Sequence, residues 1–139
     1  MKDRYGIDTN ILIYYFTGKP EKKYKKCLKL IKRAEKGEIT LEIVPLVFWE
    51  ATWVLEEYFK NSRQKIADIL KMFLRLEGIE CKDKEILNAS FNLWVKEDID
   101  FADAYIVKHY NKLKVEGIYL YDQHMEDKDI KCLKPEGKL

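Results

Sequence analysis

Residues 4–16 read RYGIDTNILIYYF, and this stretch decides the fold. Its first part, Arg4–Ile7, predicts a short strand, and Asn10–Phe16 predicts a helix. Asp8 stands between the two, directly after the strand. A strand that passes at once into a helix is the first half of the repeating unit of α/β domains.

The rest of the chain continues this alternation of strands and helices. Apolar runs bounded by turn residues predict further strands at Ile39–Val44, Ile79–Cys81, Gly117–Tyr121 and Ile130–Leu133. Helical periodicity and capping residues predict helices at Lys22–Lys36, Pro45–Phe59, Ser62–Leu76, Lys84–Lys96 and Phe101–Leu113. Strands that alternate with helices imply right-handed crossovers and a parallel sheet. We therefore expect an α/β fold, a three-layer α/β/α sandwich with a short, mainly parallel central sheet.

Length and composition exclude several classes of protein. The 139 residues fit a single domain over 1–139, and 47% hydrophobic and 13% aromatic residues exclude a disordered chain. The longest nearly apolar run, Ile43–Leu55, is too short to span a bilayer, and no signal-peptide core follows Met1, so we expect a cytoplasmic protein. Three scattered cysteines and two distant histidines predict neither a disulfide framework nor a zinc site.

Charge is distributed unevenly along the chain, although the net charge is only +2. The segment Gly18–Gly37 holds nine basic and two acidic residues, a local +7, whereas Glu77–Asp103 holds eight acidic and three basic residues, a local −5. A basic helix beside an acidic pocket suits a metal-dependent enzyme that acts on nucleic acid. The alternative is that the basic segment is only a solvated helix face.

Two aspartates follow predicted strands directly. Asp8 follows the first strand and Asp122 follows Gly117–Tyr121. Ligands of parallel α/β sheets bind beyond the carboxyl ends of the strands, so both aspartates are candidates for a site there. The alternatives are a helix N-cap for Asp8 and a simple turn residue for Asp122.

Glu50 lies within the predicted helix Pro45–Phe59. Its helical neighbours Val47, Trp53 and Val54 are apolar, so we expect the carboxylate on an apolar, buried face. Burial of a lone carboxylate lowers the stability of the fold by roughly several kcal/mol unless the group is paired, protonated or metal-bound. Glu50 is therefore a candidate metal ligand, and the alternative is a salt bridge to a lysine or arginine.

Two more carboxylates stand at the start of the predicted helix Phe101–Leu113. Asp100 is a natural N-cap, and Asp103, three residues on, imitates the acidic member of a capping box. Glutamate or glutamine is the usual residue there, and aspartate is one methylene shorter. Capping therefore explains Asp100 well and Asp103 only in part, which leaves Asp103 available to a ligand beyond the helix end.

Four carboxylates near one end of a sheet would repel one another without a counter-ion. A divalent metal removes this conflict. Ligation by oxygen alone, without pairs of cysteine or histidine, favours Mg²⁺ or Mn²⁺ over zinc. Such an ion lowers the pKa of bound water and stabilises the charge that builds on an attacked phosphodiester.

The chain resembles the PIN-domain ribonucleases, of the kind found as VapC toxins of toxin–antitoxin pairs. The motifs, in family order and spacing over nearly the whole chain, are IDTNILI at 7–13, Glu50 in the helix opened by Pro45, FADA at 101–104 and YLYD at 119–122. The resemblance implies Mg²⁺- or Mn²⁺-dependent cleavage of RNA, homodimers and an antitoxin partner.

The same resemblance implies roles for single residues. The family's acidic residues, which are both catalytic and metal-binding, correspond to Asp8, Glu50, Asp103 and Asp122. Asn10, with Thr9 beside it, matches a supporting polar position. One departure is Leu120, which stands where the family often has a serine or threonine two residues before the last acid.

Two other readings compete with a nuclease. A phosphoacceptor receiver domain has this length and strand-end aspartates, but it needs paired acids after the first strand, and here Thr9 follows Asp8. The second is a non-catalytic RNA- or protein-binding module, which remains an alternative because Leu120 lacks the hydroxyl that the family often has at this position. If the chain is a nuclease, a set of lysines can hold the RNA backbone: Lys22, Lys23, Lys25, Lys26, Lys29 and Lys32.

Overall fold

The computed structural model describes residues 2–121 and 130–136. Contacts within the chain group it into two compact units, residues 1–84 and residues 85–139, and each unit is described by itself. Among the described residues no helix is both long enough and apolar enough to cross a membrane.

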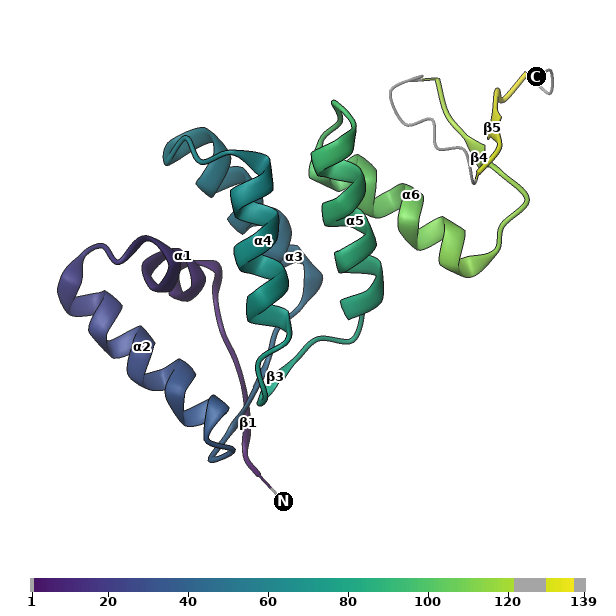
Figure 1. The fold of residues 1–139 in the computed structure, drawn as a ribbon. Helices are drawn as coiled ribbons and strands as arrows, with labels where there is room; N and C mark the ends of the chain where they lie inside the picture. The colour runs from purple at the N-terminus through teal and green to yellow at the C-terminus, as the bar shows by residue number, and fades with distance from the viewer. Residues whose placement is uncertain (1, 122–129, 137–139) are drawn as a thin grey trace. The chain divides into compact units, whose positions relative to one another are not determined.

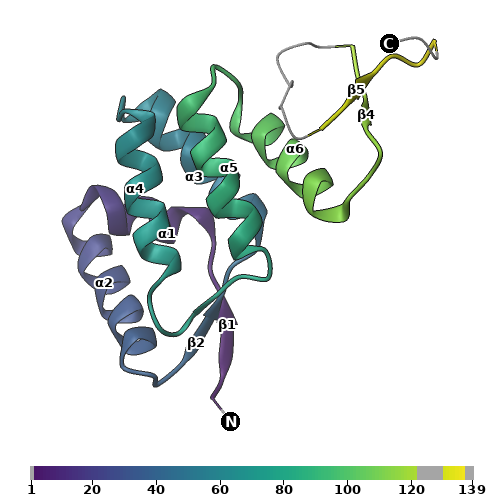
Figure 2. The same cartoon turned by 45° about the vertical axis from the view of Figure 1, so that its right-hand side comes forward.

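The first unit contains a three-stranded parallel sheet (Figure 1). Its strands are β1 (Arg4–Gly6), β2 (Thr40–Glu42) and β3 (Ile79–Glu80), in the order β1-β2-β3. Leu41, on the central strand, lies opposite Tyr5 on one side and Ile79 on the other. Figure 2 shows β1 and β2 side by side. This topology confirms the predicted α/β class with a short parallel sheet.

Helices connect the parallel strands of this unit. Between β1 and β2 run α1 (Thr9–Thr17) and α2 (Glu21–Glu35), and between β2 and β3 run α3 (Pro45–Trp53), the π-helix η1 (Val54–Tyr58) and α4 (Arg63–Leu74). Helix α1 packs against both α2 and α3. The ring of Phe73 joins three helices, because it contacts Phe16 on α1 at 5.6 Å and Phe48 on α3 at 6.5 Å between centroids.

Helix α2 follows its predicted amphipathic pattern. Cys27, Ile31 and Ala34 are buried, while the lysines between them face outward. Gly37 follows the end of the helix, where its φ of +79° is the left-handed conformation and its N–H donates to the carbonyl of Ala34. Gly78, before β3, lies against the same helix end, since a Cβ there would stand 2.2 Å from the carbonyl oxygen of Ala34.

The second unit contains α5 (Lys84–Lys96), α6 (Phe101–Leu113) and the parallel pair β4 (Ile118–Tyr119) and β5 (Cys132–Leu133). The two helices pack through aromatic rings. Phe101, the first residue of α6, lies 5.0 Å from the ring of Phe91 and 5.9 Å, edge to face, from that of Trp94. Both helices have the bounds that the apolar periodicity predicted.

The strands differ from prediction mainly in length. The predicted strand Ile39–Val44 is a strand only over Thr40–Glu42, and Gly117–Tyr121 is a strand only over Ile118–Tyr119. The predicted helix Pro45–Phe59 changes at Val54 into the π-helix, which the residue pattern did not indicate. The single domain over residues 1–139 stays a prediction.

Candidate active site

Asp8 occupies the junction between β1 and α1. Its Oδ1 accepts a hydrogen bond of 2.7 Å from the backbone N–H of Thr9, and its own carbonyl accepts one of 3.1 Å from Ile11. Asp8 is therefore the N-cap of α1, which is the alternative role that the sequence allows for it. The side chain is exposed, and no described residue donates a hydrogen bond to Oδ2. The cap thus orients one oxygen and leaves the other available to a cation.

The two predicted supporting residues differ in environment. Asn10, the second residue of α1, is exposed. Thr9 is only 6% exposed, and its Oγ1 finds no hydrogen-bond partner among the described residues. A polar atom that is buried without a partner stands directly beside the candidate ligand Asp8.

The prediction that Glu50 lies on a buried face is wrong, because its side chain is exposed. Helix α3 buries the opposite side, with Val47, Phe48, Ala51 and Thr52. Apolar residues surround Glu50 on the outer face as well, where Trp49 is 40% exposed and Trp53 is 58% exposed. Because α3 is apolar on nearly all sides, the polarity of its neighbours did not reveal which side faces the core.

The alternative proposed for Glu50, a structural salt bridge, is not formed within the described part of the chain. The nearby ion pair on this part of the fold joins Glu56 to Arg63 at 2.8 Å instead. Glu50 is therefore an exposed carboxylate whose charge no described cation neutralises by direct contact.

In the second unit, Asp100 and Asp103 open helix α6. Asp100 has the extended backbone of an N-cap, but its side chain makes no capping hydrogen bond, contrary to the expectation that capping explains it. Its backbone carbonyl accepts the first helical bond, from the N–H of Ala104 at 3.0 Å. Asp103 is half-buried in the first turn, where the helix dipole favours a negative charge.

Asp122, the fourth predicted acid, lies outside the described residues. The chain that leads to it is held by β5, since the N–H of Leu120 donates to the carbonyl of Leu133 at 2.9 Å. Lys134 donates to the carbonyl of Tyr121 at 2.9 Å. The phenol of Tyr121 donates to Glu136, and this hydrogen bond raises the pKa of Tyr121.

The structure places Asp8 and Glu50 in the first unit and Asp103 in the second. Within residues 2–121 and 130–136, no three histidine, cysteine or acidic side chains stand close enough to hold one metal ion. The donors nevertheless fit a hard divalent cation in type, because Asp8 and Glu50 offer exposed carboxylate oxygens. Thr9, the next residue in the chain, has a buried hydroxyl without a hydrogen-bond partner among the described residues.

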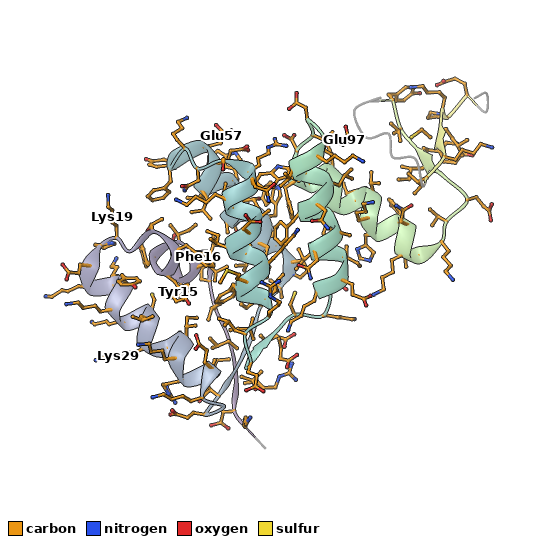
Figure 3. The ribbon with its side chains drawn as sticks, viewed as in Figure 1. Tyr15, Phe16, Lys19, Lys29, Glu57 and Glu97 are labelled. Atoms are coloured by element: carbon orange, nitrogen blue, oxygen red, sulfur yellow. The ribbon has the colours of Figure 1, made fainter. Side chains whose placement is uncertain are left out.

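The exposed face of α2 is strongly basic. Glu21 pairs with Lys25 at 3.2 Å and Glu38 pairs with Arg33 at 3.7 Å. Five further exposed lysines form no ion pair with any described residue: Lys22, Lys23, Lys26, Lys29 and Lys32. Figure 3 shows Lys29 projecting outward from the helix. Most of the positive charge on this face is therefore available to an anionic partner.

A groove of about 310 Å³ lies beside α2, and sequence reasoning missed it. It is formed by α1, α2 and the segment from α4 to Leu76, and its lining is Tyr15, Phe16, Tyr24, Leu28, Ile69, Met72, Phe73 and Leu76. Figure 3 shows Tyr15 and Phe16 on α1 near α4, and Tyr15 lies 5.8 Å from the ring of Phe73. Burial, with the negative charge of Glu35, raises the pKa of Tyr15.

Sequence patterns assign these apolar residues to helix faces, and a helix face does not reveal whether another helix covers it completely. Met72, 60% exposed on α4, shows that the cover is incomplete here. An excess of large aromatic residues on α1 is the one signal in the sequence that points to this groove.

Comparison with protein families gives a match that spans most of the chain. The family model described as PIN domain matches residues 5–131, which include residues of both units. No curated protein matches the sequence significantly.

Proposed function

We propose that this chain, which belongs to the PIN domain family, is an endoribonuclease that hydrolyses RNA phosphodiester bonds with Mg²⁺ or Mn²⁺. The PIN domain is a nuclease-type fold, and its members typically use divalent metal ions. The observation that carries the proposal is Asp8, a carboxylate fixed by the N-terminus of α1 at the carboxyl end of a parallel strand, with one oxygen unused by the described residues.

The proposed roles of the acidic residues follow from their charge. Asp8, Glu50, Asp103 and Asp122 would hold the metal, which supplies an activated water and neutralises the charge on the attacked phosphate. Because the amide of Thr9 already orients Asp8, that carboxylate needs little reorganisation to bind a cation. Glu50 forms no ion pair with a described residue, so it can bind a cation without first losing such a contact.

The basic face of α2 supports a polyanionic substrate. Its exposed lysines would contact phosphate oxygens of the RNA backbone, which gives affinity without reading the bases. Such contacts release counter-ions, so binding should weaken steeply as salt is added.

We further propose that the chain is a VapC-type toxin with an antitoxin partner. The groove beside α2 supports this partner, because its apolar lining suits a segment with large apolar side chains, and the neighbouring lysines suit acidic residues on the same segment. The exposed apolar side chains of α3, Leu46, Trp49 and Trp53, support the proposed homodimer, since a second copy could cover them.

An RNA-cleavage assay with the purified chain tests the enzymatic proposal. We expect cleavage with Mg²⁺ or Mn²⁺, none in excess EDTA, and a loss of several orders of magnitude in Asp8→Asn. Asp68→Asn is the matched control, because Asp68 is an exposed aspartate on α4 that bonds only Gln64 among the described residues. Undiminished cleavage in EDTA would contradict the metal dependence. RNA binding without any cleavage would favour the non-catalytic module.

A further inference from the structure

Two tyrosines of the YLYD motif have no role in the proposed metal site. Tyr119, in β4, and Tyr121, two residues on, lie on one face of the strand, because successive side chains of a strand point to opposite sides. Burial agrees with this alternation, since Ile118 is buried, whereas Tyr119 is 66% exposed and Tyr121 is 67% exposed. This face therefore presents two large aromatic rings to solvent.

The ring of Tyr121 is held in place although it is exposed. Its phenol donates a hydrogen bond to Glu136, and Nζ of Lys134 lies 5.5 Å from the centroid of the ring. The same ammonium group donates to the backbone carbonyl of Tyr121 at 2.9 Å, which fixes the cation beside the ring. An exposed side chain that is already ordered loses little further freedom when a ligand binds to it.

The ring of Tyr119 has no such neighbour, because no aromatic ring or cation of the described residues lies against it. Tyr119 is paired with Leu133 of β5, the strand beside β4 in Figure 1. Lys131, two residues before Leu133, is therefore on the same face of the strand pair, and it is exposed. The face combines open aromatic rings with the ammonium groups of Lys131 and Lys134.

This combination of groups matches unpaired nucleic acid. Bases outside a duplex expose flat faces that stack on tyrosine, and lysine contacts the phosphates between them. A purely apolar peptide segment would gain nothing from the two cations. A duplex would reach the cations but not the rings, because its bases already stack on one another.

We propose that Tyr119 and Tyr121 form a stacking site for unpaired bases of RNA, with Lys131 and Lys134 contacting the neighbouring phosphates. The inference rests on the proposed function and deepens it, because it names single-stranded RNA as the substrate class and assigns the residues that hold its bases. Tyrosine stacks on every base, so the site favours unpaired strands without selecting one sequence.

Leucine variants and a strand that lacks bases test this site. The probes are a fluorescent oligouridylate and an abasic ribose-phosphate strand of the same length, and anisotropy measures their affinity in excess EDTA, which keeps the RNA intact. We expect Tyr119→Leu combined with Tyr121→Leu to weaken oligouridylate binding by about fivefold or more, the lower end for one stacked base. Binding of the abasic strand should change by less than about twofold, because its phosphate charges are the same.

Tyr119→Phe keeps the ring and should bind oligouridylate within about twofold of the original chain, as expected for a stacking contact. Tyr58→Leu is the matched control, because Tyr58 is a 79% exposed tyrosine of η1 in the first unit, and it should leave the affinity unchanged. Tyr121→Leu also removes the hydrogen bond to Glu136. If the double variant does not fold, Tyr119→Leu alone gives the same comparison.

The outcomes separate this inference from the function on which it rests. An original chain that binds oligouridylate, with an unchanged affinity in the folded leucine variants, would overturn the stacking site alone. Equal losses of affinity for the two strands would also overturn it, because the tyrosines would then act on the phosphates or on the fold. A selective loss for oligouridylate in a chain that cleaves no RNA with Mn²⁺ would support the stacking site and overturn the nuclease proposal. An original chain that binds no RNA would overturn both.

Discussion

At the scale of single residues, exposure rather than sequence context decides what a carboxylate can do. Glu50 was expected on a buried face because Val47, Trp53 and Val54 are apolar, yet it lies on the outer side of α3. Periodicity predicts which residues share a face, but an all-apolar helix offers no contrast that identifies the buried one. The position of Asp8 after a strand was predictable, because strand and cap signals agree there.

The exposure of Glu50 changes the expected effect of neutralising it. Glu50→Gln should weaken Mn²⁺ binding by at least about tenfold and change the free energy of unfolding in EDTA by less than about 0.5 kcal/mol. A buried, unpaired charge would instead have made glutamine clearly stabilising. Calorimetric titration and chemical denaturation measure the two effects.

Glu57→Gln is the control for Glu50, because Glu57 is an exposed glutamate of η1, labelled in Figure 3. It should leave Mn²⁺ affinity unchanged. Equal losses of affinity in both variants would show that Glu50 acts only through the general negative charge of this surface.

Replacement of Asp100 and replacement of Asp103 should have different effects on stability and on RNA cleavage. Asp100 makes no capping hydrogen bond, so Asp100→Ala should cost no more than about 0.5 kcal/mol of stability, the low end for an N-cap. Asp103→Asn should lose RNA cleavage by orders of magnitude if Asp103 holds metal. Thermal melts and cleavage rates of both variants decide between the roles, and normal cleavage in Asp103→Asn would remove it from the site.

At the scale of elements, the helices were easier to predict than the strands. Helices α5 and α6 have their predicted bounds, because their apolar spacing and end signals lie within the segment itself. Strand length depends on a partner, and β3 pairs over only two residues of the predicted three. The π-helix η1 was not predictable from residue spacing either, because a five-residue segment with two acidic residues fits an α-helix equally well.

Gly78 gives a test of how α2 meets β3. Its φ is +80°, and an added Cβ would stand 2.2 Å from the backbone oxygen of Ala34. Gly78→Ala should therefore destabilise the chain by roughly 3 kcal/mol or more, from a left-handed backbone and a backbone clash together. Urea denaturation measures the loss.

Gly37→Ala is the matched control, because Gly37 has nearly the same φ, +79°. Its added Cβ would meet only the end of the Lys2 side chain, at 3.2 Å, which can move aside. The expected cost is about 1–2 kcal/mol, from the backbone alone. Equal costs in the two variants would show that α2 and β3 separate easily at this point.

The basic face of α2 makes a second prediction at this scale. Replacing Lys22, Lys26 and Lys29 together by glutamine should reduce the slope of log affinity for single-stranded RNA against log salt by about 2, since each lost phosphate contact removes about 0.7. Replacing the exposed lysines Lys60, Lys65 and Lys82 changes the charge equally and should alter the slope less. Equal slopes for the two triple variants would mean that only net charge matters.

At the scale of the whole molecule, the sequence predicted the class and family of the fold better than the assembly of the site. The order of strands, helices and acidic motifs is local information, and the family match over residues 5–131 agrees with it. Convergence of four carboxylates is not local, because it depends on how segments far apart in the chain come together. Asp8 and Glu50 belong to one compact unit, Asp103 belongs to the other, and Asp122 lies outside the described residues.

Hydrogen exchange with and without Mn²⁺ tests whether the acids of both units serve one ion. An ion bound to the folded chain at 100 times its dissociation constant adds about 2.7 kcal/mol of stability, and segments that hold it should exchange more slowly. We expect slower exchange at the start of α1, along α3 and in the first turn of α6, and none of these changes in Asp8→Asn. Slowing confined to α1 and α3 would mean that the ion is held by the first unit alone. Asp103 would then act on the substrate or on the helix end rather than on the metal.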